Sequence, residues 1–305
     1  MRKIAILLPV LLLSSFCFGQ TADDYIKSGL EKCQNGEYAI GLELLNKGIA
    51  LNPNIAESYN YRGIAKQELN DFQGAIADYT KAIEINPNYA KAYINRGNVK
   101  SRLGDYNGTI ADYTKSIEIM PDSDISYYYR GISRIKLDDY QGAIGDFSQA
   151  IEINPDNTAA YFDRGEAKYR LGDFEGSISD FTTVIERNPT DPSAYVLRGY
   201  SKSKLADYES AIIDLNKGIV IDPNNSFPYY LRGFFKNLSE DFQNALKDFD
   251  RAIEINPEFA DAFYERGVAN YRLGFKDKGC SDWQKAKALG SEEANNNIEQ
   301  FCNDL

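Results

Sequence analysis

Residues 158–191 read TAAYFDRGEAKYRLGDFEGSISDFTTVIERNPTD, and a stretch of the same length and pattern recurs along most of the chain. A proline returns every 34 residues, at Pro53, Pro87, Pro121, Pro155, Pro189, Pro223 and Pro257. A fixed period of this length is typical of one supersecondary unit stacked many times. With proline at position 32, the repeats begin at residues 22, 56, 90, 124, 158, 192, 226 and 260, and we number them 1 to 8.

Each repeat contains two stretches with helical periodicity. The first covers about positions 2–14, and a turn follows, with an aspartate such as Asp173 placed to cap the next helix. The second covers about positions 17–30, for example residues 72–85, with apolar residues on one helical face. Asn-Pro ends this stretch, because the residue before proline is pushed out of the helical region. The sequence therefore predicts helical hairpins that bury their apolar faces by stacking on their neighbours.

Glycine occupies position 8 in all eight repeats, although a glycine inside a helix costs about 1 kcal/mol relative to alanine. Position 20 is small as well, with Gly, Ala, Ser or Thr in every repeat. We therefore expect the two helices of a hairpin to approach each other closely at these two positions.

The aromatic residue at position 4, the glycine at 8, the small residue at 20, the aromatic at 24 and the proline at 32 together resemble the tetratricopeptide repeat. The resemblance implies an all-α fold, an α-solenoid of about eight hairpins that form a right-handed superhelix with a groove lined by the first helices. The expected organisation is a signal peptide at 1–19, repeats within 20–290 (22–55, 56–89, 90–123, 124–157, 158–191, 192–225, 226–259 and 260–290), and a C-terminal capping helix at 291–305.

Position 7 departs from the family pattern, because repeats 2–8 carry arginine where leucine is usual, and the same repeats carry aspartate at position 23. Repeat 1 lacks both residues, with Ser28 and Leu44 instead. We predict a structural ladder of Arg–Asp pairs, since a guanidinium can donate two hydrogen bonds to a carboxylate; a ligand site is the alternative. The predicted pairs are Arg62–Asp78, Arg96–Asp112, Arg130–Asp146, Arg164–Asp180, Arg198–Asp214, Arg232–Asp248 and Arg266–Asp282.

By the resemblance, positions 2, 5, 9 and 12 of the first helix face the groove, and from repeat 4 onward they are rich in aromatic residues. Clustered apolar surface marks interaction sites, and tyrosine is frequent at binding hot spots. The alternative is that these rings pack on one another. The predicted partner-binding residues are Tyr128, Phe162, Tyr169, Val196, Tyr200, Phe227, Tyr230, Phe234, Tyr264 and Tyr271. A basic edge at position 13, including Arg170 and Lys204, favours either an acidic partner or solvated helix ends.

The last repeat and the residues after it differ from the pattern. Gly290 and Ser291 replace Asn-Pro, and a final helix over about 292–302 should cover the open end of the core. Cys280 lies where other repeats face the next hairpin, so it can meet Cys302 of the capping helix. A disulfide and two packed thiols are both open.

The N-terminus begins with Arg2 and Lys3 and continues with an apolar run at 4–13, too short to span a bilayer. This pattern predicts a secretory signal peptide cleaved before Gln20, and hence a periplasmic, cell-surface or secreted protein. A retained membrane anchor and a lipid on Cys17 are alternatives. No membrane span is predicted in the mature chain.

The composition argues against several function classes. The formal charge is −11, which repels nucleic acid, and the chain has no histidine. Neither a P-loop nor a Cys-x-x-Cys motif occurs. We therefore predict no enzyme activity, no cofactor and no metal. The favoured function is a scaffold that binds a peptide segment or a partner helix, and the alternative is a self-associating structural subunit; neither the partner nor the oligomeric state can be read from the sequence.

Overall fold

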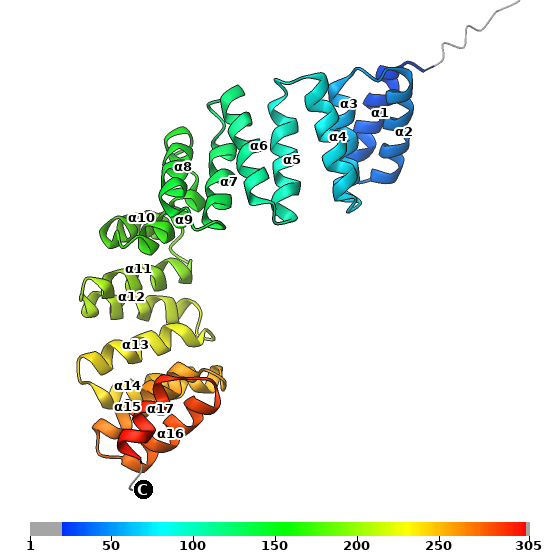
Figure 1. Ribbon diagram of the computed structural model, residues 1–305. Helices are drawn as coiled ribbons and strands as arrows, with labels where there is room; N and C mark the ends of the chain where they lie inside the picture. Colours follow the sequence, from blue (N-terminus) through cyan, green and yellow to red (C-terminus); the bar gives the residue numbers. More distant parts are fainter. Residues whose placement is uncertain (1–19, 303–305) are drawn as a thin grey trace, which may run out of the picture. The chain divides into compact units, whose positions relative to one another are not determined.

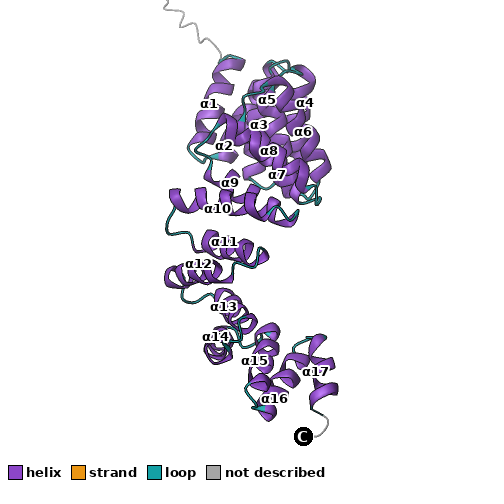
Figure 2. Cartoon of the chain, turned by 90° about the vertical axis from the view of Figure 1, so that its left-hand side faces the viewer, coloured by secondary structure: helices purple, strands orange, loops and turns teal. Residues whose placement is uncertain are grey.

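The computed structural model of the protein describes residues 20–302, which form α-helices and no strand (Figures 1 and 2). The predicted all-α solenoid of helical hairpins is confirmed, while the right-handed sense of a superhelix stays a prediction. The predicted signal peptide at 1–19 lies outside the described residues. The chain divides into two compact units, the first ending at Ile119 and the second starting at Met120.

The helices of the first unit are α1 (Ala22–Gln34), α2 (Tyr38–Leu51), α3 (Ala56–Glu68), α4 (Phe72–Ile85), α5 (Ala90–Arg102) and α6 (Tyr106–Ile119). Those of the second unit are α7 (Asp124–Ile135), α8 (Tyr140–Ile153), α9 (Thr158–Arg170), α10 (Phe174–Arg187), α11 (Pro192–Lys204), α12 (Tyr208–Ile221), α13 (Ser226–Leu238), α14 (Phe242–Ile255), α15 (Ala260–Arg272), α16 (Lys276–Ala288) and α17 (Glu293–Phe301). Each repeat supplies one odd-numbered and one even-numbered helix. Within each unit, a hairpin packs on the next one along the chain.

The turns inside the hairpins follow the local sequence. The Asp173 carboxylate accepts a hydrogen bond from the backbone N–H of Gly176 at 2.9 Å, and so caps α10. Residue 15 of the repeat adopts a positive φ, which is +81° at Gly172 and +61° at Ala206. Asp241 is an exception among the predicted caps, because its carboxylate accepts from the Asn244 side chain and makes no cap hydrogen bond. The turn geometry is therefore kept where alanine replaces glycine at residue 15 and where the aspartate makes no cap hydrogen bond.

The glycines at position 8 do allow close approach, but their nearest neighbour is often different from the one expected. A Cβ placed on Gly63 would lie 2.6 Å from Cε1 of Tyr79, the aromatic residue at position 24. The predicted contact with position 20 occurs at Gly199, where the Cβ would lie 3.0 Å from the carbonyl oxygen of Ala211. Both neighbours lie on the second helix of the hairpin, so glycine at position 8 lets a ring or a backbone carbonyl fill the space.

Candidate functional site

Two kinds of repeated side-chain cluster distinguish this chain, and the first is the Arg–Asp pair. In repeat 5, Asp180 is 2% exposed and accepts from Arg164 twice, with Nη2 2.7 Å from Oδ1 and Nε 2.9 Å from Oδ2. The same arrangement occurs in all seven repeats that carry the two residues, with Nη2–Oδ1 distances of 2.5–2.7 Å. The structure thus brings together every pair that the sequence suggested, in the fork geometry typical of arginine and carboxylate.

A second cation, which was not predicted from the sequence, completes most of these clusters. Lys168, at position 11, places Nζ 2.8 Å from Oδ2 of Asp180. A lysine or arginine at position 11 makes this contact in repeats 2–7, at 2.7–2.9 Å. In repeat 8 an amide takes its place, and Asn270 donates to Asp282 at 2.9 Å. The recurrence of Lys or Arg at position 11 was the signal available in the sequence.

The arginine also connects neighbouring repeats. Nη1 of Arg164 donates at 3.0 Å to the hydroxyl of Ser148, which belongs to the second helix of the preceding repeat. Equivalent bonds run from the arginines of repeats 2, 3, 6, 7 and 8 to position 25 of the repeat before. The guanidinium carbon lies 5.4 Å from the ring centre of Tyr161, within range for a cation–π contact. One arginine therefore fixes three helices, which is a structural role.

The second kind of cluster lies on what we call the first-helix face, defined as positions 2, 5, 6, 9 and 12 of α7, α9, α11, α13 and α15. Tyr200, Phe227, Tyr230 and Phe234 line one cleft of about 550 Å³. Tyr169 joins Tyr200 and Phe227 at a second cleft of about 280 Å³. A third cleft, of about 360 Å³, is lined by Tyr128 and Phe162. Seven of the ten predicted groove residues therefore line clefts of the second unit.

These rings are packed on one another and still reach the surface. The ring centres of Tyr169 and Tyr200 are 5.2 Å apart in a stacked arrangement, and those of Tyr230 and Phe259 are 4.9 Å apart. Phe227 nevertheless remains 40% exposed. Mutual packing thus fixes the positions of the rings and leaves an aromatic surface, while partner binding by these residues stays a prediction.

The other three predicted groove residues are placed differently. Val196 is a correction, because it is 7% exposed and packs in the core against Leu215 and Leu231. Gly218 leaves room for it, since a Cβ placed on this glycine would lie 3.0 Å from Cγ2 of Val196. Tyr264 and Tyr271 border the C-terminal core cluster, where the ring centre of Tyr271 lies 4.9 Å from that of Phe301.

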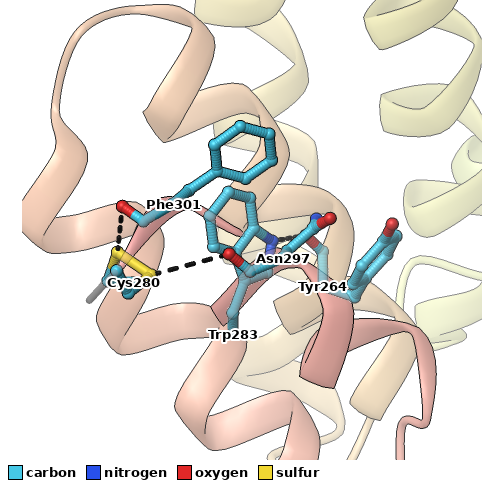
Figure 3. The surroundings of a disulfide bond; sticks show 6 residues. Tyr264, Cys280, Trp283, Asn297 and Phe301 are labelled. Carbon is cyan, nitrogen blue, oxygen red and sulfur yellow. Dashed lines mark hydrogen bonds between the residues drawn. A yellow bond between two sulfur atoms is a disulfide. The ribbon is translucent and has the colours of Figure 1, made fainter. Parts of the chain in front are cut away.

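The C-terminal cap is attached covalently (Figure 3). Cys280 of α16 and Cys302, which directly follows α17, form a disulfide, while Cys33 is a buried free thiol. Trp283 lies beside this bond and donates its indole N–H to the backbone oxygen of Tyr264 at 3.2 Å. The helix α17 packs on α16 in the place where a further repeat would begin. The capping helix expected over 292–302 is therefore present, with its helical part at Glu293–Phe301.

Two half-buried carboxyl groups on the first-helix face were not anticipated. Asp163 accepts from the Tyr128 hydroxyl at 2.7 Å, and Glu265 accepts from Nδ2 of Asn237 at 3.1 Å. Burial raises the pKa of the Asp163 carboxyl; the Tyr128 hydrogen bond opposes the rise, and Glu166 adds to it. The sequence offered no repeated pattern for these pairs, because each occurs once.

The described part of the chain offers little for other kinds of site. Within residues 20–302, no group of His, Cys, Asp and Glu is arranged to hold a metal ion. None of the helices in that range combines the length and the hydrophobicity that a bilayer span requires. What the structure does present is an aromatic face with clefts.

Comparison with known proteins points to one repeat family. Models of the tetratricopeptide repeat match residues 56–89, 78–111 and 162–226, and a model described as TPR repeat matches residues 133–172 and 239–274. No curated protein sequence matches the chain.

Solved structures share the fold. YrrB, described as a TPR protein with an unusual peptide-binding site, is 24% identical over 60% of this chain and 95% of its own, with a TM-score of 0.55. A tetratricopeptide repeat protein from Parabacteroides merdae is 21% identical over 82% of this chain and 99% of its own, with a TM-score of 0.56. MamA from Desulfovibrio magneticus is 21% identical over 56% of this chain and 96% of its own, with a TM-score of 0.54.

Proposed function

Because this chain is a tetratricopeptide repeat protein, we propose that it is a non-catalytic scaffold whose first-helix face binds a peptide segment or a helix of a partner protein. Proteins built from this repeat are interaction scaffolds. The observation that carries the proposal is the row of clefts lined by Tyr and Phe in the second unit. Large aromatic side chains at such sites supply much of the energy of protein recognition. The peptide-binding site named for YrrB supports the same use of the fold.

The test is a selection of peptides from a random twelve-residue phage library on the purified protein. Affinities of the enriched peptides are then measured by fluorescence anisotropy. The double variant Tyr230→Ala with Phe234→Ala should lose at least about tenfold in affinity, the loss that corresponds to 1.4 kcal/mol. Phe275→Ala, which removes a 51% exposed ring outside the clefts, is the matched control and should bind as the wild type does.

The double variant also loses packing, because Tyr230 contacts Phe249 and Phe259. Phe227→Ala is therefore measured as well, since its ring is already 40% exposed and its removal should leave the fold unchanged. The scaffold function is wrong if no peptide is enriched, or if all variants bind the enriched peptides equally.

A self-associating structural subunit is the second candidate, favoured by two apolar residues on α12. Val220 is 80% exposed and Ile213 is 56% exposed, and their seven-residue spacing places them on one helix face. Burial of such surface against a second copy would stabilise a dimer. Sedimentation velocity at micromolar concentration tests this function. If the wild type and the Val220→Glu variant both sediment as monomers, self-association is excluded.

We also propose that the protein is exported to the periplasm, the cell surface or the medium. The basic start and the apolar run at 4–13 support a cleaved signal peptide. The Cys280–Cys302 disulfide is consistent with an oxidising compartment. Cell fractionation and N-terminal sequencing of the processed protein test the proposal, and a cytosolic chain that retains Met1 would refute it.

A further inference from the structure

The first-helix face of the second unit carries charge of one sign. Its only charged residues are Asp163 and Glu166 on α9 and Asp261 and Glu265 on α15. Lysine and arginine are absent from these positions in α7, α9, α11, α13 and α15. The rings of Tyr200, Phe227, Tyr230 and Phe234 lie on α11 and α13, between the two acidic pairs. The face is thus an aromatic surface with acidic groups on either side, while the basic residues of position 13, Arg170 and Lys204, line the same clefts from its edge.

One member of the acidic pair on α15, Asp261, lines the largest of these three aromatic clefts. Asp261 lines the cleft of about 550 Å³ together with Phe227, Tyr230 and Phe234. Burial raises the pKa of the Glu265 carboxyl, the hydrogen bond from Asn237 opposes that rise, and the charge of Asp261 adds to it. Asp261 and Glu265 are one helical turn apart on α15, so a positive charge placed at Asp261 in the cleft would relieve their repulsion.

An unpartnered buried acceptor lies next to Glu265. Asn237 is 9% exposed, and its amide nitrogen donates to both the backbone oxygen and the carboxylate of Glu265 at 3.1 Å. These two bonds fix the orientation of the amide, since a flipped amide would set oxygen against oxygen. The amide oxygen is then the one buried side-chain polar atom within residues 20–302 that has no hydrogen-bond partner. Such an acceptor is costly unless a donor reaches it. The residues Phe234 and Leu238, on either side of Asn237 on α13, line the cleft.

The opposite end of the cleft has the opposite charge. Lys204 lines the cleft there, with its Nζ 5.1 Å from the ring centre of Tyr200. A positively charged ligand group is repelled at that end and attracted at the end of Asp261 and Glu265. The rings between them favour apolar side chains, and they also attract cations to their faces. The charges of Lys204 and Asp261 therefore favour one orientation of a peptide in the cleft.

We propose that this cleft binds a partner peptide segment in which a lysine or arginine is followed by apolar or aromatic residues. The cationic group lies against Asp261, with the carboxyl group of Glu265 one helical turn further along α15, and the apolar residues cover Tyr230, Phe234 and Phe227. The proposal rests on the scaffold function above and adds the chemistry of the partner. An acidic partner, which the basic edge with Arg170 and Lys204 would favour, is the competing outcome.

The test uses three fluorescein-labelled peptides of equal length. One has two lysines followed by Leu-Phe-Leu, and in the other two the lysines are replaced by glutamines or by glutamates. Anisotropy titrations are run at low and high salt, because an exposed charge contact weakens with ionic strength. The lysine peptide should bind at least about tenfold more tightly than the glutamate peptide at low salt, and this preference should shrink at high salt.

The variant Asp261→Asn with Glu265→Gln keeps the side-chain shapes and the acceptor for Asn237. This variant should bind the lysine peptide at least about fivefold more weakly than the wild type does, and its affinity for the glutamine peptide should change less than about twofold. Asp277→Asn, which neutralises an exposed acid in the first turn of α16, is the matched control and should have no effect. Circular dichroism verifies that all variants keep their helix content.

The outcomes separate the two proposals. The cationic partner is overturned, and the scaffold function kept, if the glutamate peptide binds more tightly than the lysine peptide. The same conclusion follows if library peptides without lysine or arginine bind and their affinity depends on Phe234. Failure of the three designed peptides while library peptides bind would also overturn it. If neither the designed nor the library peptides bind, both proposals fall.

Discussion

Replacing Asp180 tests the Arg–Asp clusters at a carboxylate that is only 2% exposed. The Asp180→Ala change removes a carboxylate that holds Arg164 at 2.7 Å and Lys168 at 2.8 Å. Removing one partner of a buried ion pair costs about 3–5 kcal/mol. The two cationic side chains are 16% and 17% exposed, so they can turn partly toward water, and we expect the lower end of that range, about 3 kcal/mol.

The cost should depend on which partner is removed. The Lys168→Met change should cost only about 1 kcal/mol, because Asp180 keeps both hydrogen bonds from Arg164. Glu186→Gln, which removes one exposed negative charge from the same helix, is the matched control and should stay within about 0.5 kcal/mol. The expected order of destabilisation is therefore Asp180, then Lys168, then Glu186.

The assay is urea unfolding followed by circular dichroism, with hydrogen exchange used to locate the opening. Repeats contribute to stability mainly through themselves and their nearest neighbours, so faster exchange should be confined to repeat 5 and the hairpins beside it. A double-mutant cycle with Arg164→Ala and Asp180→Ala should give a coupling energy of about 2 kcal/mol or more. Additive losses would refute the pairing as a source of stability, as would an Asp180→Ala protein as stable as Glu186→Gln.

Three further predictions concern other parts of the chain. Cys302→Ser should lower the free energy of unfolding of the last repeat by about 3 kcal/mol, because the disulfide no longer closes its loop in the unfolded chain. The fluorescence of the single tryptophan, Trp283, should then change at a lower urea concentration. An unchanged midpoint would show that the bond contributes nothing to stability. Gly63→Ala should destabilise the protein by about 1–3 kcal/mol, since the new Cβ would lie 2.6 Å from a ring atom of Tyr79. Gly97→Ala should instead stabilise it by up to about 1 kcal/mol, because the nearest contact of its Cβ is 3.4 Å. Thermal unfolding measures both variants, and equal effects would contradict the packing argument. Asp163→Asn should stabilise the protein at pH 7, because burial raises the pKa of this carboxyl and the penalty for its charge is present above that pKa. This penalty disappears as the pH falls toward the ordinary aspartate pKa of about 4. The difference in unfolding midpoint between variant and wild type should therefore narrow from pH 7 to pH 4. A constant difference would contradict the raised pKa of Asp163 as its cause.

The hairpins were predictable because their signals repeat. Proline and glycine return at fixed positions in successive repeats, so the pattern does not depend on any single residue that could occur there by chance. The second stretch of repeat 2 was expected at residues 72–85, where α4 lies. The Arg–Asp pairing was visible for the same reason, because both residues are missing together from repeat 1. Lys168 and its equivalents repeat as well, yet a lysine one helical turn after the arginine looks like an ordinary solvated residue.

The clefts were predictable only as a general surface. Val196 and Tyr230 occupy the same position in consecutive repeats, but Val196 enters the core and Tyr230 lines a cleft. The difference comes from residue size and from position 27 of the same repeat, which is Gly218 beside Val196 and Ala252 in the repeat of Tyr230. The bond between Asn237 and Glu265 joins different positions of two repeats and occurs once. Such unrepeated contacts depend on the packing of neighbouring hairpins and leave no period in the sequence.

The arginine bond to position 25 of the preceding repeat gives the array a direction that matters during synthesis. A hairpin that has just left the ribosome carries its aspartate and its own arginine, but the polar side chain on its second helix still lacks the donor that follows it. Ser148, for example, gains its partner only when Arg164 of the next repeat has emerged. Each newly made first helix therefore completes the hairpin made before it, so the nascent chain should become protease-resistant one repeat behind the point of emergence.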